Sequence, residues 1–317
     1  MPTRPTRLIM DTDGGIDDAL ALILALRSPE VEVVGVSTVS GNVRVEQAAI
    51  NVLRVIELFD HRDVWVAQGL ANPLIRDPVR ATSFHGMDGL GDSNLPQPRM
   101  RARKESAIDL IIEELTKEKD HGLTIICIGP LTNIAAVITN SPSISGRIGE
   151  LLIMGGAFGL SKYGHGNVTP VAEFNIYSDP EAAKIVFESG VSLKCVGLDE
   201  TMTPGAQLSP REYATIKRSE TDHAQFAAKI LAKAMGREKR FALHDPMAIA
   251  MKVRPSLFKF QDYHVNVETK GEYTTGMTVS DRRDRPSKEL QGQRIAVCKD
   301  AKAAAFKQVF LRRLMSR

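Results

Sequence analysis

The sequence predicts an α/β fold, with an open, mostly parallel, Rossmann-like sheet and helices on both of its faces. Two observations predict it. Short apolar runs alternate with segments of helical periodicity from the start of the chain, and the runs are apolar almost throughout. Strands of that kind are buried on both faces, as in a parallel sheet that helices cover. Right-handed βαβ crossovers are then expected.

The first half of the chain shows the alternation most clearly. We expect strands at 7–11, 31–39, 64–67, 123–128 and 150–154, and helices at 17–27, 43–59, 106–119 and 131–140. Residues 69–103 interrupt the alternation with many Gly, Pro, Asp and Arg residues. Long loops in compact domains are usually functional or mobile, so this segment is a candidate part of the site.

The second half begins with a clear helix start at Ser178-Asp179-Pro180-Glu181, where a capping residue precedes a proline suited to the first turn. We expect a strand at 193–198, helices at 210–218, 221–237 and 247–251, strands at 263–268, 276–280 and 294–297, and a last helix at 301–314. Neither a long linker nor a repeat divides the chain, so we expect one domain spanning residues 1–317.

Composition excludes some classes of function. The 317 residues include 41 basic and 38 acidic residues, and the net charge of +3 gives no reason to expect a nucleic-acid partner. Cys127, Cys195 and Cys298 lack metal-binding or redox spacing and are expected to be buried in a reducing compartment. No apolar run approaches the ~20 residues of a membrane span. We therefore expect a cytoplasmic protein without a membrane partner.

The stretch from Leu8 to Leu20 concentrates four carboxylates in eight residues. Asp11 and Asp13, two apart on a strand, share one face. Glycines at 14 and 15 permit a sharp reversal, and the acids at 17 and 18 then fall in the first turn of a helix. Like charges ~4 Å apart repel by about 4 kcal/mol at an effective dielectric of ~20, so a convergent cluster favours a bound cation.

The residue types indicate which cation would bind. All four side chains are hard oxygen donors with no interleaved Cys or His, which favours Ca²⁺ or Mg²⁺ over Zn²⁺. The EF-hand pattern does not fit, because Leu22 stands where a bidentate Glu is required. Ligands of open parallel sheets bind beyond the carboxyl ends of the strands. We therefore expect the acids to share one site with the polar loops that follow the other strands.

Several further motifs follow in order along the chain. They are Gly41-Asn42, His85-Gly86-Met87-Asp88-Gly89-Leu90, Gly129-Pro130-Leu131-Thr132-Asn133, Met154-Gly155-Gly156-Ala157, the run Glu173-Phe174-Asn175 continuing to Ala183, and His244-Asp245-Pro246. With the acidic signature at 11–19, this ordered set resembles the inosine-uridine-preferring nucleoside hydrolases, which are Ca²⁺-dependent N-ribohydrolases. The resemblance implies the nucleoside hydrolase fold and hydrolysis of ribonucleosides to free base and ribose.

The resemblance also implies roles for individual residues. Asp13, Asp18 and Asp245 would coordinate Ca²⁺ together with the backbone carbonyl of Ile128. Asp13 would also be the general base for the attacking water, and His244 would protonate the leaving base. The residues implied to contact the substrate are Asp17, Asn42, Asn167, Glu173 and Asn175 at the ribose hydroxyls, Met154 and Phe174 along the sugar, and His85 near the base. Asp11 would be a supporting acid.

Local geometry adds one expectation for the sugar-binding residues. Glu173 and Asn175 are two apart, so on an extended segment both would face the ribose. The resemblance further implies a homo-oligomer, either a dimer or a tetramer. It leaves open the preference for purine, pyrimidine or modified bases.

The sequence departs from the family pattern at two places. Gly14 stands where many members have Pro. Some members place a Tyr upstream of the His-Asp-Pro motif to engage the base, but no Tyr occurs between Ala214 and Asp262. Phe226 and Phe241 are the aromatic residues that we consider for stacking there.

Two other functions compete with this interpretation. A Mg²⁺-dependent phosphohydrolase of the haloacid-dehalogenase type would use Asp11 as nucleophile and Asp13 as acid and base. That pattern predicts neither the adjacent acids at 17 and 18 nor the Glu-Phe-Asn motif. A ribose-recognition protein without turnover is disfavoured, because the residues implied in catalysis and metal binding are all present.

Overall fold

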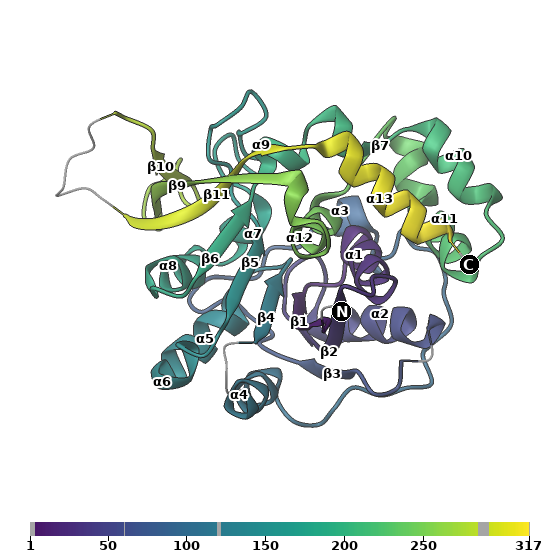
Figure 1. The fold of residues 1–317 in the computed structure, drawn as a ribbon, viewed down its shortest axis with the longest axis horizontal. Helices are drawn as coiled ribbons and strands as arrows, with labels where there is room; N and C mark the ends of the chain where they lie inside the picture. The colour runs from purple at the N-terminus through teal and green to yellow at the C-terminus, as the bar shows by residue number, and fades with distance from the viewer. Residues whose placement is uncertain (1–3, 60, 119–121, 285–291, 317) are drawn as a thin grey trace.

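A nine-stranded sheet forms the centre of the computed structural model, which describes residues 4–59, 61–118, 122–284 and 292–316 (Figure 1). The strands of this sheet are β1 (Thr6–Thr12), β2 (Val31–Thr38), β3 (Trp65–Gln68), β4 (Leu123–Cys127), β5 (Glu150–Met154), β6 (Leu193–Val196), β9 (Phe258–Val267), β10 (Thr278–Asp281) and β11 (Gln293–Ala301). Their order is β10-β9-β11-β6-β5-β4-β1-β2-β3. All neighbours pair in parallel except β9, which is antiparallel to β10 and β11.

The order of the strands determines where in the sheet a ligand site can form. Within it, β3-β2-β1-β4-β5-β6 is the order of the doubly wound Rossmann sheet, whose direction of growth reverses between β1 and β4. Connections leave these two strands in opposite directions, so a crevice opens beyond their carboxyl ends. The acidic signature follows β1 and Ile128 follows β4. The chain therefore brings both to the reversal point.

Helices cover both faces of the sheet (Figure 1). The first hydrophobic cluster includes residues of α1 (Ile16–Leu26), α2 (Val45–Leu58), α11 (Asp222–Arg237), α12 (His244–Val253) and α13 (Ala303–Met315), and the second includes residues of α4 (Ala107–Lys117), α5 (Thr132–Asn140) and α8 (Pro180–Glu188). In β1, Leu8 and Met10 belong to the first cluster and Ile9 to the second. The predicted double-sided burial is thus confirmed.

Short elements complete the fold around the carboxyl edge and the C-terminal region. They are α3 (Thr82–His85), α6 (Pro142–Ser145), α7 (Phe174–Ser178), α9 (Leu198–Thr201), α10 (Pro210–Arg218), the 3₁₀ helices η1 (Pro204–Ala206) and η2 (Pro255–Leu257), and the two-stranded sheet of β7 (Gln207–Leu208) and β8 (Phe241–Ala242). Two strands are much longer than predicted: β9 begins at residue 258 rather than 263, and β11 spans Gln293–Ala301 rather than 294–297, because the first half of β9 pairs with the second half of β11.

Capping explains the predicted start of α8. Asp179 is buried, and its Oδ1 accepts from the Ala182 N–H at 3.0 Å. Its Oδ2 accepts from the Leu74 N–H at 2.9 Å and from the Thr132 hydroxyl at 2.8 Å. The helix start at this position was predicted from the sequence. The sequence analysis did not predict that the same carboxylate also holds the long loop after β3 and the start of α5 against α8.

Two predicted boundaries are wrong near the site. The helix expected at 247–251 already begins at His244, so the His-Asp-Pro motif is its first turn rather than its leader. The segment at 173–175 is not extended, because Phe174 opens the short helix α7. The predicted helix end at Lys119 lies outside the described residues.

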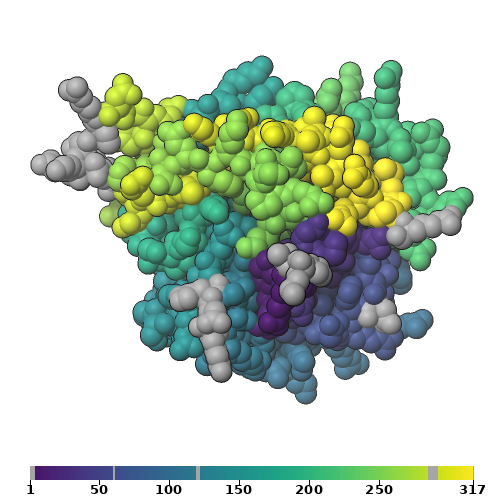
Figure 2. Space-filling model, viewed as in Figure 1, coloured from purple at the N-terminus to yellow at the C-terminus, as the bar shows by residue number. Residues whose placement is uncertain are grey.

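The two ends of the chain pack against each other. Helix α13 contacts α1, and the Arg27 guanidinium donates to the Ser316 carbonyl at 2.9 Å. Arg313 pairs with Glu30 at 2.9 Å. Figure 2 shows the C-terminal segment, in yellow, lying beside the N-terminal segment in purple. Among the described residues, no helix combines the length and apolar character needed to cross a membrane.

The turn between β1 and α1 depends on two glycines. Gly14 has φ of +74°, in the left-handed region, and a Cβ there would lie 2.5 Å from Ala48 Cα. A Cβ on Gly15 would lie 2.6 Å from Asn42 Nδ2 and 2.8 Å from His85 Nδ1. Since proline is fixed near φ −65°, this turn follows a path that proline at position 14 could not take.

We predict that Gly14→Pro lowers the free energy of unfolding by about 1–3 kcal/mol or more, because the ring cannot adopt positive φ. Thermal unfolding of the purified variant measures the effect. The matched control is Gly236→Ala in α11, where an added Cβ meets nothing within 4 Å. That control should gain up to about 1 kcal/mol from helix propensity. A Gly14→Pro protein with the wild-type Tm would contradict the described turn.

Candidate active site

A cavity of about 660 Å³ opens at the carboxyl edge of the sheet. Most of the residues expected at the site line it: Asp17, Asn42, His85, Ile128, Met154, Asn167, Glu173, Phe174, Asn175, His244 and Asp245. Asp13 and Asp18 do not line this cavity, but both are bonded to Asn42, which does. Its volume lies within the range of small-molecule sites.

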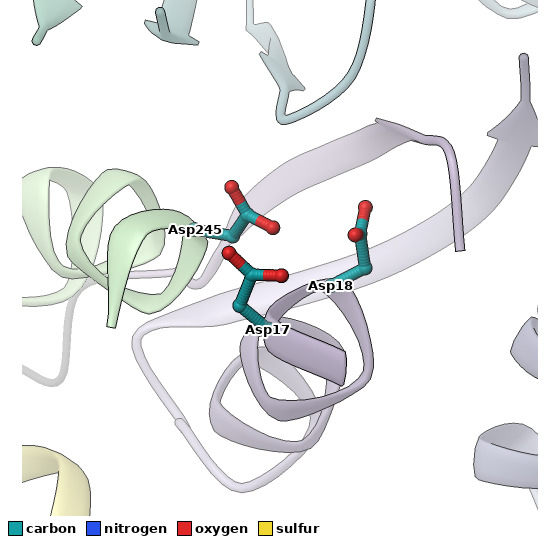
Figure 3. Close-up of side chains that lie close together, drawn as sticks. All are labelled: Asp17, Asp18 and Asp245. Carbon is teal, nitrogen blue, oxygen red and sulfur yellow. The ribbon is translucent and has the colours of Figure 1, made fainter. Parts of the chain in front are cut away.

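Three carboxylates from two helices lie close together, and two of them, Asp17 and Asp245, line this cavity (Figure 3). Asp17 and Asp18 come from the first turn of α1, and Asp245 comes from the first turn of α12. One oxygen of each lies within 4.8 Å of the others, and all three residues are buried. Asp17 Oδ1 is buried and accepts no hydrogen bond from any described residue. Such an all-oxygen group fits a hard divalent cation.

Asp13 lies beside this group, held by Asn42. Its Oδ2 accepts from the Asn42 N–H at 2.7 Å and its Oδ1 from the Asn42 Nδ2 at 2.8 Å. The same Nδ2 donates to Asp18 Oδ2 at 3.1 Å. The expected ligand set was Asp13, Asp18 and Asp245. In the structure Asp17 joins Asp18 and Asp245 in the converging group, and Asp13 is connected to that group through Asn42.

The turn fixes the orientation of Asp18. Its Oδ2 accepts from the Gly15 N–H at 2.8 Å. Its Oδ1 accepts from the Thr12 hydroxyl at 2.5 Å and from the Asp13 N–H at 3.2 Å. The start of α1 therefore positions this carboxylate before any ligand binds.

The cluster is electrostatically costly. Burial, reinforced by the neighbouring Asp18, raises the pKa of Asp17 to about 8 and raises that of Asp13 well above its ordinary value. Burial and the charge of Asp17 likewise raise the pKa of Asp245. A cation among these oxygens would offset both the lost solvation and the repulsion.

We predict that Asp17→Asn stabilises the metal-free protein, and does so more at about pH 8.5 than at about pH 4.5. The pKa of Asp17 is about 8 in the folded chain against an ordinary 3.8. Between these values the unfolded chain releases a proton that the folded chain keeps, so wild-type stability falls as pH rises through this window. Asparagine removes that penalty.

Thermal unfolding in chelator across this pH range measures the difference between the Asp17→Asn variant and the wild type. Asp109→Asn, at an exposed position of α4, is the control. Its difference from the wild type should be independent of pH. A pH-independent difference for Asp17→Asn would show that ionisation of this carboxyl is not costly.

Asp11 supports the cluster from behind. It is fully buried, and its Oδ1 accepts from the Ser37 hydroxyl at 2.5 Å and the Asn133 amide at 2.7 Å. Burial raises its pKa to about 7, although these two bonds oppose the shift. Asp11 does not line the cavity.

Glu173 and Asn175 lie at the cavity in a different geometry from the predicted one. Glu173 caps α7: its Oε1 accepts from the Asn175 N–H at 2.9 Å, and its Oε2 from the Ile176 and Gly156 N–H groups at 3.1 Å. The prediction that Glu173 and Asn175 share one face of an extended segment is therefore wrong. The buried Glu173 carboxylate accepts hydrogen bonds from backbone N–H groups of the first turn of α7, which places Asn175 in a helix. The Asn175 amide donates to the carbonyls of Ile128 at 3.2 Å and Met154 at 3.1 Å.

Asn167 comes from the loop that precedes α7. Its Oδ1 accepts from the Phe174 N–H at 3.0 Å, and the residue is exposed. This bond holds the loop against the cavity. Phe174 and Met154 line the same wall.

Both expected histidines reach the cavity, each with one ring nitrogen engaged. His85 Nδ1 accepts from the Ile16 N–H at 3.1 Å. His244 Nδ1 and the Thr201 hydroxyl lie 2.8 Å apart. Burial lowers the pKa of each histidine to about 4. Both rings are therefore neutral near pH 7, and their pKa values lie below the ~6.5 of an unperturbed imidazole.

The exposed aromatic at the cavity is Phe84, which the sequence analysis missed. Phe84 is 42% exposed and stacks on Phe241 with ring centroids 5.9 Å apart. Phe241 and Phe226 are buried and do not line the cavity, so neither is placed to stack on a base. The sequence signal that could have identified Phe84 is its position next to His85 in the long loop. Other lining residues missed are Val79, Arg80, Ala81, Ser83, Val168, Met202, Gln207, Glu238, Lys239, Arg240 and Ala242.

Fold and site together define an α/β protein with a small-molecule crevice over buried acids. A family model described as inosine-uridine preferring nucleoside hydrolase matches residues 8–308. The chain belongs to this family, which confirms the resemblance.

Known nucleoside hydrolases are similar to this protein over most of its length. The pyrimidine-specific ribonucleoside hydrolase RihA of Enterobacter sp. (strain 638) is 39% identical over 281 residues, covering 86% of this chain and 87% of the relative. A plant nucleoside hydrolase, PpNRh1, has a TM-score of 0.91 at 29% identity, covering 99% of this chain and all of the other. A purine-preferring ribonucleoside hydrolase from Gardnerella vaginalis has a TM-score of 0.87 at 33% identity, covering 98% of each chain.

Proposed function

We propose that this protein hydrolyses the N-glycosidic bond of ribonucleosides to free base and ribose, using a water that Asp13 deprotonates. The observation that carries the proposal is the group of buried carboxylates of Asp17, Asp18 and Asp245 at the cavity of a nucleoside hydrolase fold. The relatives are named for pyrimidine and for purine nucleosides alike. They support ribonucleosides as the substrate class without selecting a base.

We assign Ca²⁺ as the metal. Asp13, Asp18, Asp245 and the Ile128 carbonyl would hold it, and the observed convergence of Asp17 on the same point adds a further oxygen. A bound divalent cation makes water more acidic and takes vicinal hydroxyls into its coordination shell. Hard oxygen donors, with no sulfur or nitrogen ligand among the three converging side chains, favour Ca²⁺ or Mg²⁺.

Asp13 is the general base in this proposal. Both of its oxygens are oriented by Asn42, so the carboxylate has one defined position beside Asp18. A bound cation would keep this carboxylate ionised, which a proton acceptor requires. Asp13 takes the proton as the water oxygen attacks the anomeric carbon.

The cavity wall would bind the sugar. Cleavage passes through an oxocarbenium-like ribose, which nearby carboxylates stabilise. Asp17 and Glu173 supply acceptors, and the amides of Asn42, Asn167 and Asn175 supply donors for the hydroxyls. Met154 and Phe174 pack along the ring.

The leaving base would lie between α3 and the segment that precedes α12. These two segments touch, since the Arg237 guanidinium donates to the Ser83 carbonyl at 2.9 Å and Phe84 stacks on Phe241. His244, whose ring is neutral near pH 7, would donate a hydrogen bond to the base as it leaves with the electrons of the broken bond. The departing base then takes its proton from solvent. His85 lines the same region. Phe84 offers its exposed face to the base.

Family membership disfavours both rival functions. The two acids that a phosphohydrolase would use, Asp11 and Asp13, lie within the residues that the nucleoside hydrolase model matches. The relatives are named as hydrolases, which favours turnover over binding alone. A homo-oligomer, either dimer or tetramer, and a cytoplasmic location remain predictions.

We predict that Asp13→Ala lowers kcat for ribonucleosides by at least about 10³-fold with an unchanged fold, since a general base and a metal ligand are both lost. Release of free base measures turnover, and circular dichroism checks the fold. Asp109→Ala is the matched surface control. Retained turnover in a folded Asp13→Ala protein would remove this residue as the base.

We predict that exhaustive chelation abolishes turnover and lowers Tm, and that Ca²⁺ restores both. A ligand that binds only the folded state at about 100 times its Kd adds about 2.7 kcal/mol of stability. The assay compares ribonucleosides with p-nitrophenyl phosphate. Full activity after chelation would contradict the metal site, and turnover confined to the phosphate ester would contradict the proposed reaction.

A further inference from the structure

We propose that Thr201 is a positioning residue that fixes the tautomer of His244, so that the Nε2 of this histidine carries a proton into the cavity. The inference rests on the proposed function, because that function places His244 at the leaving base. It extends the function to a residue outside the cavity, on the short helix α9.

The contact that carries the inference is a buried hydroxyl–imidazole pair. Thr201 is fully buried, and its Oγ1 lies 2.8 Å from His244 Nδ1. The Thr201 N–H bonds to the Gly197 carbonyl at 3.2 Å, which holds the residue in α9. His244 lines the cavity while its Nδ1 is engaged by Thr201. The nitrogen left for a ligand in the cavity is therefore Nε2.

The available donors and acceptors determine which group donates in the hydrogen bond between Thr201 and His244. Within the described part of the chain, Thr201 Oγ1 has no hydrogen-bond partner, side chain or backbone, other than His244. If Nδ1 carried the proton, the buried hydroxyl hydrogen would have no acceptor, and a buried donor without a partner is costly. When the hydroxyl donates instead, both groups are satisfied. Nδ1 is then the acceptor and the ring proton resides on Nε2.

The second histidine of the cavity shows the same arrangement with an unambiguous donor. His85 Nδ1 receives its hydrogen bond from the backbone N–H of Ile16, which can only donate. Neutral His85 is therefore also protonated on Nε2. The cavity thus has two imidazoles whose Nδ1 atoms are engaged by donors of the protein, one by backbone and one by Thr201.

The chemical consequence concerns the breaking glycosidic bond. Negative charge grows on the base as the bond lengthens, and a donor already directed at it stabilises that charge without reorganisation. An Nε2–H on His244 meets this need, whereas the other tautomer would direct a lone pair at the base. A wrong tautomer of a catalytic histidine is a known cause of large losses in kcat.

The first test measures the tautomer directly and needs no turnover. Two-dimensional ¹H–¹⁵N spectra of the Ca²⁺-loaded, ¹⁵N-labelled protein distinguish protonated from unprotonated ring nitrogens, and His244→Ala assigns the signals. We expect protonated Nε2 and unprotonated Nδ1 on His244 in the wild type and in Thr201→Ser. We expect a changed Nδ1 signal in Thr201→Val. A protonated Nδ1 in the wild type would overturn the inference.

The second test separates positioning from general damage. Thr201→Val, which keeps the shape of the side chain, should lower kcat for ribonucleosides by about 10- to 100-fold, with KM changed by less than about threefold. The rate with p-nitrophenyl riboside, whose leaving group needs no donor, should change by less than about threefold. Thr201→Ser should restore ribonucleoside turnover. Thr124→Val, at a buried threonine at the other end of β4, controls for loss of a buried hydroxyl.

The outcomes distinguish this inference from the function on which it rests. Equal losses on both substrates, or failure of serine to restore turnover, would make Thr201 merely structural. If no ribonucleoside is hydrolysed by the wild type, the proposed function fails, and the ¹⁵N spectra still decide the tautomer. Melting temperatures of both Thr201 variants show whether a loss reflects unfolding.

Discussion

Repulsion among buried carboxylates is the constraint on which this structure depends. Carboxylate oxygens of the buried residues Asp17, Asp18 and Asp245 lie within 4.8 Å of one another, and Asp13 shares the Asn42 amide with Asp18. Burial raises the pKa values of Asp13, Asp17 and Asp245. A fold tolerates such a cost where function requires it. The reversal point of the sheet meets the requirement, since the first turns of α1 and α12 reach one crevice from different parts of the chain.

Three asparagines hold the carboxyl edge together around these acids. Asn42 joins the turn after β2 to Asp13 and Asp18, and Asn133 joins α5 to Asp11 and the Thr38 carbonyl. Asn175 links the ends of β4 and β5. An amide can donate to a carboxylate or a carbonyl without adding charge of its own. These side chains therefore connect neighbouring loops without altering the charge balance of the site.

Sequence reasoning predicted the sheet, the helices that cover it and nearly half of the residues that line the cavity, because apolar runs and strand-end motifs carry local signals. It failed where burial decided the local structure. Glu173 starts a helix since its carboxylate needs backbone donors, and His244 already lies inside α12. Phe84 and Thr201 were missed because only tertiary packing brings them to Phe241 and His244. The specific roles of Asp13 and His244 came from family resemblance rather than from pattern.

The division of labour in the cavity has an evolutionary consequence. The acids are buried at strand and helix ends, and Asp13 and Asp18 are held there by several hydrogen bonds each. Ser83, Phe84, Lys239 and Arg240, in contrast, belong to α3 and a connecting loop and have exposed side chains. Mutation can alter the second group at small structural cost. Divergent base selectivity can thus arise on an unchanged hydrolytic centre, and directed evolution aimed at nucleobase choice should sample these loop positions first.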